Sequence, residues 1–65
     1  MKTMLLEVNA DNLKLSTMEG KTYNVEPWDI TICCTWTPTT EIEIYTEKGQ
    51  RFCKNLSSDQ TVRLR

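Results

Sequence analysis

Apolar and polar residues alternate along most of this chain, which is the pattern of strands that bury one face. Residues 13–25 alternate on both sides of Gly20, and residues 40–54 alternate on both sides of Gly49. In each copy a threonine precedes the glycine by three residues, and an aromatic residue follows it three residues later. A glycine in this position closes a three-residue hairpin loop because it adopts the left-handed conformation easily. The pattern therefore predicts two hairpins.

The first predicted hairpin has residues 18–20 as its loop. This register places Thr17 opposite Lys21, Leu15 opposite Tyr23, and Leu13 opposite Val25. The apolar side chains of both strands then lie on one face, as a half-buried sheet requires.

The second predicted hairpin has residues 47–49 as its loop, so that Ile44 faces Phe52. A two-residue turn at Lys48 and Gly49 would instead pair Phe52 with Tyr45. A slip of one residue moves the apolar set of a strand to the other face. We favour the three-residue loop because it keeps Phe52 on the side of the isoleucines.

Residues 30–37 also alternate and are rich in β-branched and aromatic side chains, which predicts a strand between the hairpins. The side chains expected to point inward are Ile30, Ile32, Cys34 and Trp36. Cys33 is then expected to point outward, and the register of the second hairpin also turns Cys53 outward.

A last strand is predicted at residues 61–65, and a further strand in the opening segment, with Met4, Leu6 and Val8 on one side. Residues 55–60 are typical of a loop or a single helical turn. No segment of about 11 residues or more has an apolar stripe at helical spacing. Five or six short strands in 65 residues normally close on themselves. We predict an all-β fold in a single domain, residues 1–65: a small five- to six-stranded antiparallel barrel, SH3-like or OB-like.

The order of turn and packing residues resembles that of a group of short, uncharacterised bacterial proteins with a small β-barrel pattern. The residues that carry the resemblance are Leu15, Gly20, Tyr23, Val25, Asp29, Trp36, Ile42, Phe52, Asn55, Leu56, Val62 and Leu64. In those proteins a strand, a glycine turn, an aromatic-x-valine strand, a tryptophan and an Asn-containing segment recur. The turn after the tryptophan there tends to be Gly-Asp, whereas Pro38 follows Thr37 here. The resemblance implies a small β-barrel and transfers no catalytic residue.

Composition argues against several classes of function. Eight basic and nine acidic residues give a net charge of −1, which provides no long-range attraction to phosphate backbones. Histidine is absent, and the three cysteines are too few for a structural zinc site made of Cys and His alone. We therefore predict no metal site, no cofactor and no enzymatic activity, and nothing in the sequence matches a catalytic motif.

The odd number of cysteines indicates reduced thiols, and the apolar run at the N-terminus is too short for a signal peptide or a membrane span. We expect a cytoplasmic protein that does not associate with membranes.

The remaining function that the side chains suggest is binding of another molecule. Trp28 follows a proline at a predicted bend, and Tyr45 is expected on the outer face of its strand beside Arg51. Aromatic rings next to arginines are typical of binding surfaces for peptides and for bases. The candidate binding residues are Trp28, Tyr45, Arg51, Arg63 and Arg65.

The function predicted from these residues is that of a non-catalytic protein-interaction module, which contacts another protein through an outer sheet face or an edge strand. The alternative is single-stranded nucleic-acid binding by an OB- or Sm-like barrel, in which Trp28 and Tyr45 stack on bases and the arginines contact phosphates.

Overall fold

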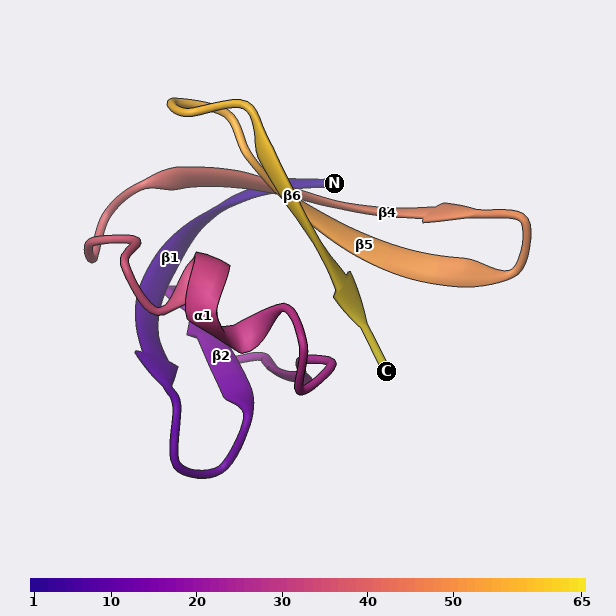
Figure 1. The fold of residues 1–65 in the computed structure, drawn as a ribbon. Coiled ribbons are helices and arrows are strands. Elements are labelled where there is room, and N and C mark those ends of the chain that lie inside the picture. Colours follow the sequence, from indigo (N-terminus) through magenta and orange to yellow (C-terminus); the bar gives the residue numbers. More distant parts are fainter.

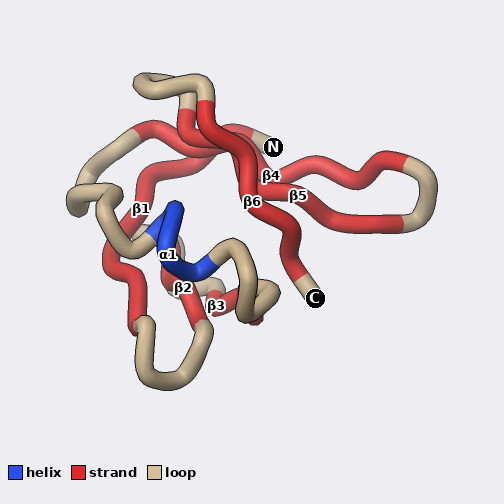
Figure 2. Tube along the Cα trace, in the orientation of Figure 1, coloured by secondary structure: helices blue, strands red, loops and turns tan.

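The computed structural model describes all 65 residues. Figures 1 and 2 show six strands and one short helix. The elements are β1 (Lys2–Asn9), β2 (Lys14–Thr17), β3 (Thr22–Asn24), α1 (Ile30–Cys33), β4 (Glu41–Glu47), β5 (Gln50–Asn55) and β6 (Gln60–Leu64). The prediction of an all-β fold is confirmed, and so are the predicted first and last strands.

All six strands belong to one antiparallel sheet with the order β3-β2-β1-β4-β5-β6. The first four strands form a Greek key, because β4 returns through α1 to lie beside β1. A bulge between Leu5 and Glu7 bends β1, so its first residues pair with β4 and its later ones with β2. Figure 1 shows this curvature of β1, which folds the sheet around a single interior.

The predicted closed barrel is not confirmed. The two ends of the sheet meet at one bridge, between Val25, just after β3, and Leu64 of β6. Two backbone hydrogen bonds flank the bridge: Glu26 N–H to Arg63 O at 3.1 Å, and Arg65 N–H to Asn24 O at 2.8 Å. Elsewhere the outer edge of β3 has no neighbouring strand. We call this incomplete junction between β3 and β6 the seam.

The first hairpin has the predicted register, with Leu15 opposite Tyr23. Gly20 adopts a φ of 90°, and its N–H donates to Thr17 O at 3.0 Å. The Thr17 side chain is buried and accepts a hydrogen bond from the Lys21 N–H at 3.3 Å. The left-handed glycine therefore closes this loop as the sequence predicts.

The predicted register of the second hairpin is wrong. Tyr45 pairs with Phe52, and Glu47 pairs with Gln50, so the loop contains only Lys48 and Gly49. Both loop residues have positive φ, 52° and 79°, as the two-residue turn that matches strand twist requires. Phe52 thereby moves to the outer face, where its ring stacks on that of Tyr45 with centroids 5.5 Å apart.

The predicted strand over residues 30–37 is also wrong. Residues 30–33 form α1, whose backbone bonds begin at the Asp29 carbonyl oxygen, and a turn follows before Trp36. Helical spacing buries Cys33 and exposes Cys34, the reverse of the prediction. Cys53, expected to point outward, is fully buried because of the changed hairpin register.

The interior is one cluster of ten buried apolar residues that come from every strand except β3 and from α1 and the segments beside it. They are Leu5, Leu15, Val25, Cys33, Trp36, Ile42, Ile44, Cys53, Val62 and Leu64. Trp36 is buried as predicted, and its indole N–H donates to Gln60 Oε1 at 2.9 Å. The core therefore holds β6 at both ends, at Gln60 through Trp36 and at Leu64 beside the seam.

Candidate functional site

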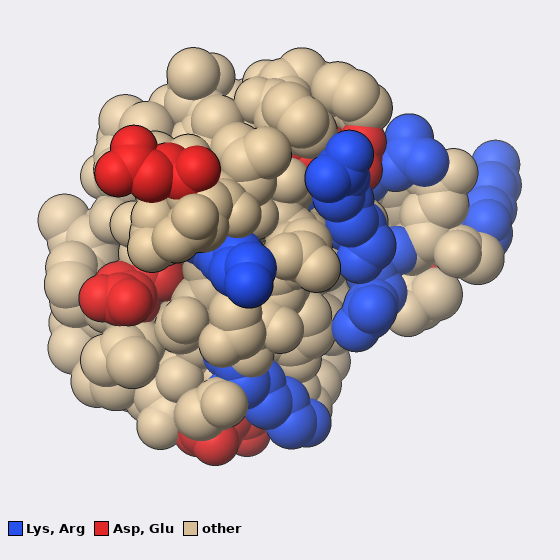
Figure 3. Space-filling view, turned by 90° about the horizontal axis from the view of Figure 1, so that it is seen from below, with Lys and Arg blue, Asp and Glu red and all other residues tan.

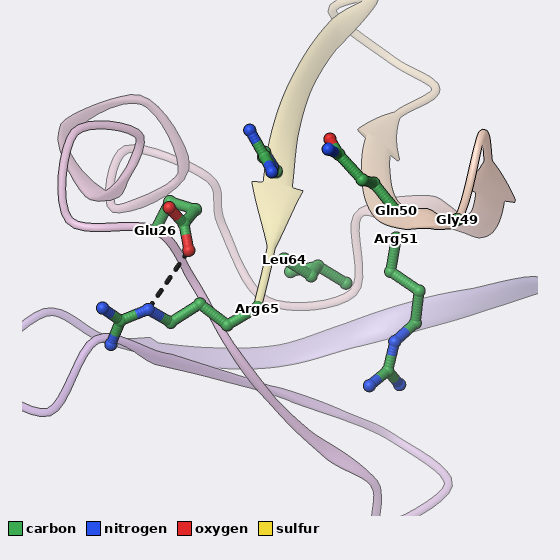
Figure 4. Close-up of a pocket in the computed structure, with 7 residues that line it drawn as sticks. Glu26, Gly49, Gln50, Arg51, Leu64 and Arg65 are labelled. Carbon is green, nitrogen blue, oxygen red and sulfur yellow. Dashed lines mark hydrogen bonds and ion pairs between the residues drawn. The ribbon is translucent and has the colours of Figure 1, made fainter.

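A concavity of about 360 Å³ opens at the end of the seam, between the start of β5 and the end of β6. Its lining residues are Glu26, Gly49, Gln50, Arg51, Arg63, Leu64 and Arg65. The chain contains three arginines and five lysines, and all the arginines but none of the lysines line this pocket. We call it the arginine pocket; Figure 4 shows it in detail.

The strand pairing of β5 and β6 brings these arginines together from distant parts of the sequence. Arg51 pairs with Leu64, so Arg63 and Arg65 flank the residue opposite Arg51 at this end of the sheet. Arg63 pairs with Phe52, so its side chain leaves β6 on the face opposite to that of Arg51. Glu26 reaches the same place because the bridge between Val25 and Leu64 joins the end of β3 to β6. Since β6 ends at Leu64, the outer edge of β5 beside Gln50 has no neighbouring strand.

Arg65 has an ion-pair partner in the pocket. Its Nε donates to Glu26 Oε1 at 3.1 Å, and the Glu26 side chain is only 13% exposed whereas that of Arg65 is 57% exposed. This pair ties the chain after β3 to the end of β6. Arg65 is the exposed partner, so an incoming anion can reach its guanidinium, and the mostly buried Glu26 carboxylate then competes with that anion for it.

Arg51 has no ion-pair partner. Its guanidinium carbon lies 5.7 Å from the centroid of the Tyr23 ring, so the side chain of this β5 residue spans the gap to β3. A guanidinium over an aromatic face is held by the ring quadrupole and keeps its N–H groups available. Tyr23, which the predicted register places on the apolar face of the first hairpin, is half-buried and serves as the platform for this arginine.

Arg63 is fixed through its backbone. Its N–H donates to Asp29 Oδ2 at 2.9 Å, and its carbonyl oxygen accepts from the Glu26 N–H. Asp29 stands immediately before α1 and uses its carboxylate on β6 instead of capping the helix. The short helix thus positions the strand that carries two of the three arginines.

The electrostatic balance of the pocket is positive, since three arginines face one glutamate. The other ion pair of the protein joins Lys54 Nζ and Asp59 Oδ1 at 2.9 Å, and the hydrogen bond that Lys54 donates to Asp59 raises the pKa of Lys54. Figure 3 shows that blue side chains gather near the β4-β5 hairpin, which projects at the right of the view, whereas several red ones lie on the other side. A net charge of −1 therefore conceals a local cationic surface.

The other two predicted binding residues do not line the pocket. Tyr45 lies on the outer face of β4 with Phe52, whereas the neighbouring Thr46 pairs with Arg51. Adjacent residues of a strand point to opposite faces, so Tyr45 and Arg51 are separated by the sheet. Trp28 is 64% exposed in the segment between β3 and α1.

Two of the three thiols, those of Cys33 and Cys53, belong to the apolar core. Burial raises the pKa of Cys33 to about 11 and that of Cys53 to about 12. Both are fully buried, and Cys34 alone is exposed. No three His, Cys, Asp or Glu side chains lie close enough together to hold a metal ion.

Sequence reasoning missed Glu26 and Gln50 as pocket residues, and it missed an exposed apolar group on β1 and in the turn after β2. Met4, Leu6 and Met18 are each more than two-fifths exposed, and the Met18 N–H donates to Met4 O at 2.9 Å. The two-residue turn at Lys48 and Gly49 was the available signal for the pocket, because that turn fixes where β5 begins.

The fold and the pocket define a small all-β structure with one antiparallel sheet and a cationic concavity at the seam of that sheet. The one helix, α1, is not long and apolar enough to cross a membrane. Comparison with known protein families, with curated proteins and with solved structures finds no match for this chain. The resemblance to short bacterial proteins is supported only as far as a small antiparallel β-sheet.

Proposed function

We propose that this protein is a non-catalytic interaction module that binds an extended segment of another protein along the seam. The observation that carries the proposal is the free outer edge of β3, which touches β6 at a single bridge and opens beside the arginine pocket. A strand edge presents unpaired backbone N–H and C=O groups, and an added strand satisfies them.

Backbone geometry identifies the groups that a partner would meet. Asn24 directs its carbonyl oxygen towards β6, where it accepts from Arg65, and the Val25 N–H points the other way, to Leu13 O. Because residues two apart in a strand direct their backbone groups to the same side, Thr22 directs its N–H and C=O away from β2. A partner strand would continue the hydrogen bonding that the bridge at Val25 begins.

The proposal also includes the type of barrel and the cellular compartment. The Greek key order and the single interior support a partly open small barrel of the SH3-like or OB-like kind. The three free cysteines support a reducing, cytoplasmic setting.

Selection from a display library of random, unstructured peptides tests the proposal. We expect extended, β-branched sequences to be enriched and to lose binding to a Thr22→Pro variant, which lacks the outward N–H. The matched control is Thr22→Val, which keeps this N–H and loses only the exposed hydroxyl contact with Ser16. Failure to enrich any sequence, or equal binding to both variants, contradicts edge recognition.

Single-stranded nucleic-acid binding is the second candidate, and the exposure of Trp28 favours it, since a free indole ring can stack on a base. The other rings support it less: Arg51 covers Tyr23, Tyr45 stacks on Phe52, and Trp36 is buried. Tryptophan fluorescence titrated with oligothymidine at low salt distinguishes the candidates. Quenching that weakens steeply with added salt would favour nucleic acid.

A further inference from the structure

We infer that the arginine pocket recognises the carboxylates of an acidic, extended peptide segment, and this inference rests on the proposed function. The chemical class follows from the lining: three arginines, one glutamate, a short stretch of β5 edge and the side of Leu64. A peptide that pairs with the free strand edges would carry its side chains directly past these cations.

The use of arginine alone favours carboxylates. Arginine offers a planar fork of N–H donors that matches a carboxylate in bidentate geometry, whereas lysine is a flexible point charge. All five lysines lie outside the pocket, so its basic side chains are all arginines, whereas the basic side chains elsewhere on the protein are all lysines. The free guanidinium of Arg51, held by Tyr23, is already oriented for such a contact.

The ligand should carry more than one carboxylate. In Figure 4 the side chains of Arg51 and Arg65 leave their strands on either side of Leu64, and their guanidinium groups point apart. One small anion therefore does not engage both. In an extended peptide, adjacent residues point to opposite faces and alternate residues repeat at about 6–7 Å, so several acidic residues can meet separate arginines.

Glu26 acts as an internal competitor for the ligand. It occupies Arg65 in the free protein at 3.1 Å and is the only acidic side chain of the lining. A carboxylate that binds Arg65 must displace or share this contact. Replacing Glu26 by glutamine keeps a carbonyl acceptor for Arg65 and removes the competing charge, so Glu26→Gln should tighten the binding of an acidic peptide.

Titration with three synthetic peptides of about ten residues tests the inference; in them threonine alternates with glutamate, glutamine or lysine. Binding is followed by backbone amide chemical shifts at about 0.15 M salt. We expect the glutamate peptide to bind about tenfold more tightly than the glutamine peptide, and the lysine peptide to bind least. Glu26→Gln should strengthen binding of the glutamate peptide several-fold.

Two variants complete the design. Arg51→Gln should abolish the preference for glutamate, whereas Lys2→Gln removes the same charge from an exposed site on β1 and should preserve it. Thermal unfolding checks that both variants fold. Arg65→Gln, at an exposed position, replaces Arg51→Gln if that variant is unfolded.

The outcomes separate this inference from the proposed function. Binding of the glutamate and glutamine peptides with equal affinity, or an unchanged preference in Arg51→Gln, overturns the carboxylate site and leaves edge recognition standing. Tighter binding of oligothymidine than of the glutamate peptide overturns it in favour of nucleic acid. No binding of any peptide overturns both.

Discussion

Replacing Asp29 by alanine should destabilise the protein and loosen the seam. The Asp29 carboxylate accepts the Arg63 N–H at 2.9 Å, across 34 positions of sequence, and is half-buried. A hydrogen bond to a charged group contributes about 1.5–3 kcal/mol, and partial exposure favours the lower half, about 1.5–2 kcal/mol. A core of this size leaves a net stability of only about 3–5 kcal/mol, so roughly half of it should be lost.

Thermal unfolding followed by circular dichroism measures the effect. At about 4–8 °C per kcal/mol, Asp29→Ala should lower Tm by roughly 10 °C. Asp11→Ala is the matched control, because Asp11 is exposed and its side chain has no hydrogen-bond or ion-pair partner. Amide exchange of Glu26 should also accelerate, since its N–H bonds to Arg63 O. A Tm for Asp29→Ala within a few degrees of that for Asp11→Ala would refute this role.

Three further predictions concern the turn, the thiols and the outer face. Lys48→Asn should raise the free energy of unfolding in urea by about 0.5 kcal/mol, because asparagine tolerates the positive φ before Gly49 better than lysine; an unchanged or lower value contradicts this. Burial raises the pKa of Cys33 to about 11 and that of Cys53 to about 12, so the folded protein keeps protons that the unfolded chain releases near pH 9. Stability should therefore fall as pH rises above about 9, less steeply when both are replaced by alanine, and equal slopes would count against it. Tyr45→Ala should cost about 1 kcal/mol through loss of ring stacking and leave peptide affinity unchanged; weaker peptide binding would show that the outer face takes part.

The first hairpin was predictable because glycine at its only left-handed loop position and the alternating apolar residues require the same register. At the second hairpin these two signals disagree. Keeping Phe52 inward favours a longer loop, but the chain places Lys48 in the left-handed region and gives Phe52 an aromatic partner on the outer face. The apolar pattern shows that the Phe52 side chain needs an apolar neighbour. It does not show that Tyr45 is this neighbour.

The error at residues 30–37 has a different cause. Local preference for a strand is real there, but the connection between β3 and β4 packs on the interior as a helical turn, which buries Cys33 and Trp36 together. Tertiary contacts override a local preference of this size. Sequence alone identified the three arginines as candidates, whereas their meeting with Glu26 depends on strand pairing and on one bridge.

A map of backbone amide shifts upon titration with the alternating glutamate-threonine peptide tests the seam most directly. We predict that the largest changes fall on residues 22–26, 49–51 and 63–65, the two free edges and the arginine pocket between them. Largest changes around Met4, Leu6 and Met18, or around Tyr45 and Phe52, would place recognition on the outer face and contradict the account.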